Sequence, residues 1–226
     1  MKKLIAIILA MAMLCGFAAI GATAAENDLQ AQGEALLRET FEILNSGVFT
    51  LESRNTIEGR ESSMITTMDG DRMATETIIN WAEIEPGLQS FVLWLLLGNT
   101  MRMVFAPGGT SMVFPERRIY FAMPAASDDF FDMILTMAAE MPEHVAVTEK
   151  IVDGITYICV SVEIEGATTS CYYLDGQLKR VVTIFAGDII VQEIDFFTGT
   201  VNQSLFSTSR MVRIPLMLYV WLFSII

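Results

Sequence analysis

The sequence predicts an α+β fold in which one large antiparallel sheet packs against a few helices. Short apolar runs separated by Gly-containing turns recur along most of the chain, which is typical of antiparallel strands. Helical periodicity is confined to a few segments. The chain has 226 residues, of which 53% are hydrophobic. That is enough to bury a full core in one domain, and it excludes an intrinsically disordered chain.

The charge balance is acidic, with 27 Asp and Glu against 14 Lys and Arg and a net charge of −13. Phosphate contacts need clustered Lys and Arg, so a nucleic-acid partner is not expected.

Residues 1–25 have the layout of a secretory signal peptide. Lys2 and Lys3 precede an apolar run, and Ala22-Thr23-Ala24 fits the A-x-A cleavage pattern. We expect cleavage after Ala24 or Ala25 and an exported protein. An uncleaved membrane anchor and a lipoprotein lipidated at Cys15 remain alternatives. The mature chain is then a single domain over residues 26–205, followed by a hydrophobic tail over residues 206–226.

The first mature element is expected to be an amphipathic helix over residues 28–45, which Asn45-Ser46-Gly47 ends. A strand begins at Val48. Residues 62–68 and 72–79 flank Asp69-Gly70-Asp71 and predict a hairpin.

Residues 88–97 predict a short helix whose every face is apolar. Such a helix is wholly buried, covers an apolar cavity, or touches lipid. The residues alone leave all three readings open.

Three further strands are expected over residues 101–105, 111–114 and 116–123. A second amphipathic helix follows, capped by Ser127 and ended by Pro142.

The rest of the chain predicts an antiparallel meander of five strands with Gly-marked turns. Its strands are expected over residues 145–152, 155–164, 168–174, 178–185 and 189–196.

No catalytic, metal or cofactor motif is present in the sequence. His144 is the only histidine, and no C-x-x-C, H-E-x-x-H or G-x-S-x-G pattern occurs. We therefore expect no enzyme activity, no metal and no cofactor. A hydrolase that uses a pair of carboxylates stays a minor alternative, because 27 acids always offer pairs.

The order of elements resembles the LolA/LppX-like lipoprotein-carrier superfamily. The likeness rests on the strand sequences 102–105 (Arg-Met-Val-Phe), 111–114 (Ser-Met-Val-Phe) and 118–121 (Arg-Ile-Tyr-Phe), and on the later runs 155–164 and 171–180. The resemblance implies a curved half-barrel with helices on its concave face, which takes lipid acyl chains and has no catalytic residues.

An excess of Met and Phe, 15 and 14 residues, suits a cavity that adapts to flexible apolar ligands. Alternation along strands and helical spacing group ten apolar residues into one predicted pocket. They are Phe91, Trp94, Leu95, Met103, Phe105, Ile119, Phe121, Phe130, Ile134 and Met137. The alternative is that the same side chains interdigitate and leave no space.

Cys159 and Cys171 flank the turn at Glu165-Gly166. If Glu163 pairs with Ala167, the two cysteines lie directly opposite each other, near disulfide distance. Export permits oxidation. A register shift by one residue would instead leave two small buried thiols.

Residues 214–226 are apolar except for Ser224 and are too few for an ordinary spanning helix. This end is a strand or helix docked on the core, a tail in peripheral contact with a membrane, or an atypical end of the reading frame.

Taken together, the sequence favours an exported, non-catalytic binder or carrier of a lipid or other apolar small molecule at the cell envelope. It would act outside the cell or at the outer face of the cytoplasmic membrane. The alternative is an envelope protein-interaction module with a filled core.

Overall fold

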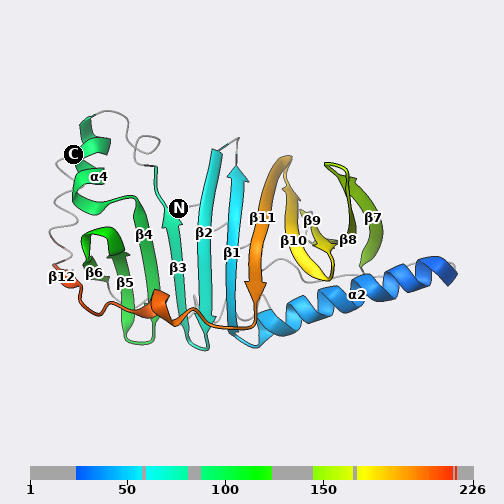
Figure 1. The fold of residues 1–226 in the computed structure, drawn as a ribbon, viewed down its shortest axis with the longest axis horizontal. Coiled ribbons are helices and arrows are strands. Elements are labelled where there is room, and N and C mark those ends of the chain that lie inside the picture. The colour runs from blue at the N-terminus through cyan, green and yellow to red at the C-terminus, as the bar shows by residue number, and fades with distance from the viewer. Residues whose placement is uncertain are drawn as a thin grey trace.

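The computed structural model describes residues 24–57, 60–80, 88–123, 145–164, 167–215 and 217. Within them lie one mostly antiparallel sheet and two α-helices, α2 (Ala24–Asn45) and α4 (Leu88–Leu97) (Figure 1). The strands are β1 (Val48–Ile57), β2 (Arg60–Asp69), β3 (Arg72–Ile78), β4 (Thr100–Ala106), β5 (Gly109–Phe114), β6 (Ile119–Met123), β7 (Ala146–Val152), β8 (Ile155–Ile164), β9 (Ala167–Leu174), β10 (Gln177–Phe185), β11 (Asp188–Thr198) and β12 (Val212–Ile214).

The sheet consists of two meanders joined side by side. Its order is β12-β6-β5-β4-β3-β2-β1-β11-β10-β9-β8-β7, so β1 to β6 and β7 to β11 each pair in chain order. The two meanders meet where β1 pairs with β11, a contact that we call the seam. The sheet is open, with β7 and the short parallel strand β12 at its edges (Figure 1).

Turn chemistry explains the regular hairpins of the second meander. Asp153-Gly154 and Asp175-Gly176 both have positive φ at each residue (53° and 81°, 51° and 78°). Two such residues in succession suit a tight hairpin turn, because their twist matches that of the flanking strands. The predicted strands of this meander are confirmed to within two residues at each end.

One predicted strand is shorter than expected. The sequence predicts a strand over residues 116–123, but β6 begins at Ile119. Pro115 starts a 3-10 turn, η1 (Pro115–Arg117), because its fixed φ and missing N–H favour the first turn of a helix over a sheet ladder.

After β11 the chain crosses the sheet. It forms a 3-10 turn, η2 (Gln203–Phe206), whose Leu205 packs on Ala74, Val104 and Val113. The guanidinium of Arg102 donates to the carbonyl oxygens of Ser204 and Leu205, at 3.2 and 3.3 Å. This crossing delivers β12 to the edge beside β6, so part of the segment predicted as a tail belongs to the sheet.

Candidate functional site

The two faces of the sheet carry different side chains. Residues that pair across antiparallel strands share a face. The register from β1 to β6 therefore puts every methionine of β2 to β6 on one face, which we call the methionine face. These residues are Met64, Met68, Met73, Met101, Met103, Met112 and Met123. The opposite face, which we call the polar face, carries charged pairs such as Arg102 with Glu76, at 2.6 Å, beside the apolar cluster that Leu205 covers.

Both described helices pack on the methionine face, at its two ends. Leu37 and Phe41 of α2 are buried in one cluster with residues of β1, β8, β9, β10 and β11. Leu93 and Leu97 of α4 are buried in a second cluster with Phe114 and Phe121. Each helix is therefore held by apolar burial, worth about 1.5–3 kcal/mol for each large side chain.

Thioethers line the strands that lie between the two helix clusters. Met64, Met68 and Met73 are buried, whereas Met103 and Met112 are half-buried. Because methionine has three rotatable bonds and a polarizable sulfur, this part of the face can adapt to varied apolar shapes.

Four of the predicted ligand residues lie on the methionine face: Met103, Phe105, Ile119 and Phe121. Met103, Met112 and Phe121 form one row across β4, β5 and β6. Phe105 and Ile119 lie on the same face in the rows beside it. Phe121 is buried by α4, and the other three predicted residues are half-buried.

The three predicted residues of α4 point away from the sheet. Phe91, Trp94 and Leu95 are exposed, while Leu93 and Leu97, four residues apart, face the strands. The helix is therefore buried on one side only, and the reading that it is wholly buried is wrong. A segment that is apolar all round contains no signal for which side meets the sheet.

The remaining predicted residues, Phe130, Ile134 and Met137, lie outside the described residues, as do the second predicted helix and His144.

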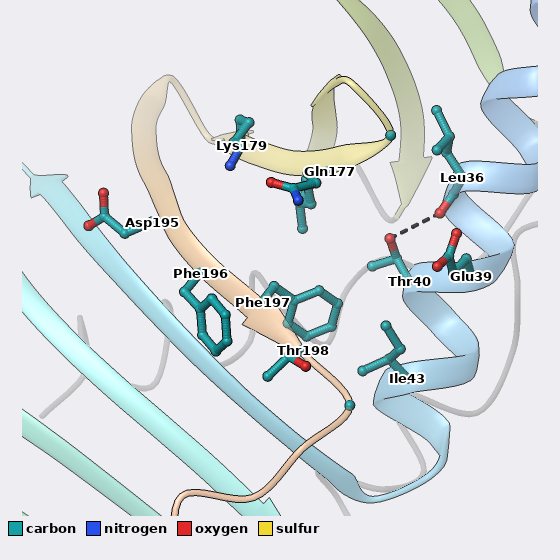
Figure 2. Close-up of a pocket in the computed structure, with 13 residues that line it drawn as sticks. Leu36, Glu39, Thr40, Ile43, Gln177, Lys179, Asp195, Phe196, Phe197 and Thr198 are labelled. Atoms are coloured by element: carbon teal, nitrogen blue, oxygen red, sulfur yellow. Dashed lines mark hydrogen bonds between the residues drawn. The ribbon is translucent and has the colours of Figure 1, made fainter.

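A cleft of about 320 Å³ opens between α2 and the adjoining ends of β10 and β11 (Figure 2). Figure 2 shows Phe197 of β11 pointing toward Thr40 of α2 across this cleft. The walls are Leu36, Glu39, Thr40 and Ile43 from α2, residues 176–179 around the start of β10, and residues 195–199 at the end of β11. A smaller void of about 20 Å³ shares Thr40, Leu178 and Phe197 with it and reaches Gln192 and Ile194 beneath the helix.

Charged, polar and apolar side chains all line this cleft. Asp195 accepts two hydrogen bonds from Arg54, at 2.6 and 2.8 Å, and these lower the pKa of its carboxyl. In the interior, the hydroxyls of Thr40 and Tyr173 lie 3.0 Å apart, and burial raises the pKa of the tyrosine. The cleft therefore offers both polar and apolar contacts. Sequence reasoning did not predict these residues, because the packing of α2 beside β10 and β11 brings together segments that lie more than 130 residues apart in the chain.

A buried polar group interrupts the methionine face at the seam. Asn55 pairs with Gln192, whose amide donates to the hydroxyl of Ser53 at 2.9 Å. All three residues are buried, and Oδ1 of Asn55 has no hydrogen-bond partner among the described residues. An unmade hydrogen bond to a buried carbonyl costs about 1–3 kcal/mol, so this acceptor favours a polar donor brought by a ligand or water.

The predicted disulfide is absent, and Cys159 and Cys171 are free, buried thiols. Ile164, rather than Glu163, pairs with Ala167, so the register is shifted by one residue. Cys171 lies opposite Val160 on the methionine face and Cys159 opposite Tyr172 on the other face. Burial raises the pKa of Cys171 to about 12, which makes this thiol unreactive.

Among the described residues, no group of His, Cys, Asp and Glu side chains is arranged to hold a metal ion. In the same part of the chain, neither helix is both long and apolar enough to cross a bilayer.

No protein-family model and no curated protein sequence matches the chain. Among solved structures it is similar to LprF from Mycobacterium bovis, at 9% identity and a TM-score of 0.46 over 74% of this chain and 93% of that one. It is also similar to the Mycobacterium tuberculosis lipoprotein LppX, at 9% identity and a TM-score of 0.43 over 76% and 98%.

A third similarity is to the MucA/MucB complex of Pseudomonas aeruginosa, at 9% identity and a TM-score of 0.40 over 79% of this chain and 62% of that one.

Proposed function

We propose that this protein is a non-catalytic, exported binder or carrier of a lipid or another apolar molecule with a polar end, acting at the cell envelope. The observation that carries the proposal is the one-sidedness of the sheet. Every methionine of β2 to β6 lies on the face that both helices flank.

The ligand would lie along the methionine face between α2 and α4, with the sheet curving around it as a half-barrel. Half-buried Met103, Phe105 and Met112 would contact its apolar part. Burying apolar surface against them contributes about 25 cal/mol per Å², so a single acyl chain supplies ample binding energy.

The polar end would meet either the cleft beside α2 or the unpaired Oδ1 of Asn55. The signal-peptide pattern of residues 1–25 supports the proposed export.

Native mass spectrometry of the purified protein, with a search for co-purified lipid, is the first test. Titration with a fluorescent fatty acid follows, on the parent and on Met103→Trp, which fills the centre of the face. The matched control is Ile184→Trp, an exposed position on the polar face.

A real site predicts binding by the parent and the control, and at least about tenfold weaker binding by Met103→Trp with stability nearly unchanged. A filled core predicts no bound lipid and no fatty-acid binding. Met103→Trp would then overpack the core and lower the free energy of unfolding by about 1–3 kcal/mol.

A further inference from the structure

Helix α4 presents a contiguous apolar surface to solvent. Phe91, Trp94, Leu95 and Leu96 are 55%, 41%, 52% and 44% exposed, and the first three share one helical face by their spacing. We call these four residues the outer face of α4. The rings of Phe91 and Trp94 lie 5.7 Å apart, so they form one patch rather than scattered side chains. Isolated exposed apolar residues are common on soluble proteins, but a patch of this kind marks a contact surface.

Arginines border this patch in an otherwise acidic protein. The guanidinium carbon of Arg117 lies 5.9 Å from the centre of the Trp94 ring, and its Nη2 donates to the Trp94 carbonyl oxygen at 3.0 Å. Arg118 follows it and is also exposed. In residues 88–123 the only acid is Glu116, although the whole chain has a net charge of −13.

The same end of the sheet receives further positive charge from the C-terminal crossing. The amide of Val212 donates to the carbonyl oxygen of Arg118 at 2.7 Å, and Arg213 is paired beside Tyr120. Residues 196–217 contain two arginines and no acid. Apolar exposure and positive charge therefore meet where Arg117 contacts Trp94, although Glu83 and Glu85 precede α4 in the sequence.

We propose that the outer face of α4 docks on an anionic lipid bilayer, with the helix lying in the plane of the interface. Phe91, Leu95 and Leu96 would enter the boundary between headgroups and acyl chains, and Trp94 would lie at headgroup level. Arg117 and Arg118 would contact anionic headgroups. A helix of 10 residues is about 15 Å long, so it lies on a bilayer and does not cross it.

The test is co-sedimentation of the protein with vesicles of phosphatidylcholine alone and of equal parts phosphatidylcholine and phosphatidylglycerol. The variant is Phe91→Ser with Leu95→Ser. The matched control is Phe185→Ser with Ile151→Ser, which are 51% and 74% exposed and lie in β10 and β7 of the second meander.

Binding is expected to the mixed vesicles and to weaken with salt. The Phe91/Leu95 variant should bind at least about tenfold more weakly, the control variant should bind like the parent, and Arg117→Gln should lose part of the preference for phosphatidylglycerol. Met103→Trp should still bind vesicles, which separates docking from ligand uptake on the methionine face.

Three results would overturn the proposal: no vesicle binding by the parent, equal loss in the control variant, or equal binding by the Phe91/Leu95 variant. Gel filtration adds a fourth. A dimer that disappears with Phe91→Ser and Leu95→Ser, without vesicle binding, would assign this face to a second copy of the chain.

Discussion

The turn between α4 and β4 is held by a glycine that no other residue can replace cheaply. Gly98 has φ +80° and donates its N–H to the Trp94 carbonyl oxygen at 2.8 Å, which ends α4. A Cβ at this position would lie 2.5 Å from Oε2 and 3.0 Å from Cβ of Glu116. Gly98→Ala therefore meets both backbone strain and a collision.

The two effects have separate magnitudes. The left-handed conformation costs an alanine about 1–2 kcal/mol relative to glycine. The collision moves a carboxylate whose Oε1 accepts hydrogen bonds from the N–H groups of Asn99 and Thr100 and from the Thr100 hydroxyl, at 3.1, 3.0 and 2.8 Å. Because Glu116 is exposed, we take the loss of these bonds as about 1–2 kcal/mol in total. Gly98→Ala should therefore lower the free energy of unfolding by about 2–4 kcal/mol.

Urea denaturation of the parent, Gly98→Ala, Glu116→Ala and the double variant measures both effects. Without the Glu116 side chain, Gly98→Ala should cost only the backbone strain, about 1–2 kcal/mol, so the two substitutions should be non-additive. A cost below about 0.5 kcal/mol in the parent background, or an equal cost in both backgrounds, would refute the reasoning.

Three further predictions concern α2, the thiols and an ion pair. Leu37→Ala should lower the free energy of unfolding by about 2–5 kcal/mol, because Leu37 is fully buried between α2 and the sheet; urea denaturation measures it. Under denaturing, non-reducing conditions both Cys159 and Cys171 should be alkylated, whereas the native protein should react slowly at Cys171, as mass spectrometry will show. Arg54 lowers the pKa of Asp195 below its ordinary 3.8, so the carboxylate stabilises the fold above that pH and loses this effect as the pH falls through the lowered pKa. The stability difference between the parent and Asp195→Asn should therefore be largest near neutral pH and vanish in strong acid.

Each of these predictions has a contrary outcome. A loss at Leu37→Ala no larger than that of an alanine at exposed Arg38 would place α2 off the sheet. A mass two units below that of the dithiol protein would show that Cys159 and Cys171 form a disulfide after all. A stability difference at Asp195 that grows toward acid would reverse the assigned direction of its pKa shift.

Local chemistry made the hairpins predictable from the sequence. Asp-Gly pairs at positive φ leave little freedom in where a strand turns, so β7 with β8 and β9 with β10 followed from their turns. The turn at Glu165-Gly166 was ambiguous, because a loop of two or three residues suits the same pair. The burial pattern of the two flanking strands did not fix their register either, since residues on both faces, such as Val160 and Cys159, are buried.

The candidate site was only partly predictable. Alternation placed Met103 with Phe105 and Ile119 with Phe121, and the register confirms that each pair shares a face. The side of α4 that meets the sheet was not predictable, because a helix without polar residues on any one stripe has no preferred orientation in its pattern. The cleft at α2 depends on contacts between segments far apart in the chain, for which local periodicity holds no information.

The seam between β1 and β11 sets the order in which the chain can fold. Each meander closes through neighbours in sequence, which loop-closure entropy makes fast, but β1 must wait for a partner about 140 residues away. We expect two locally paired halves to form first and the seam to close late. Until it does, β1 and β11 are both unprotected edges carrying apolar residues such as Leu51 and Ile194. The interval before closure is then when the chain is most open to aggregation and most in need of a chaperone.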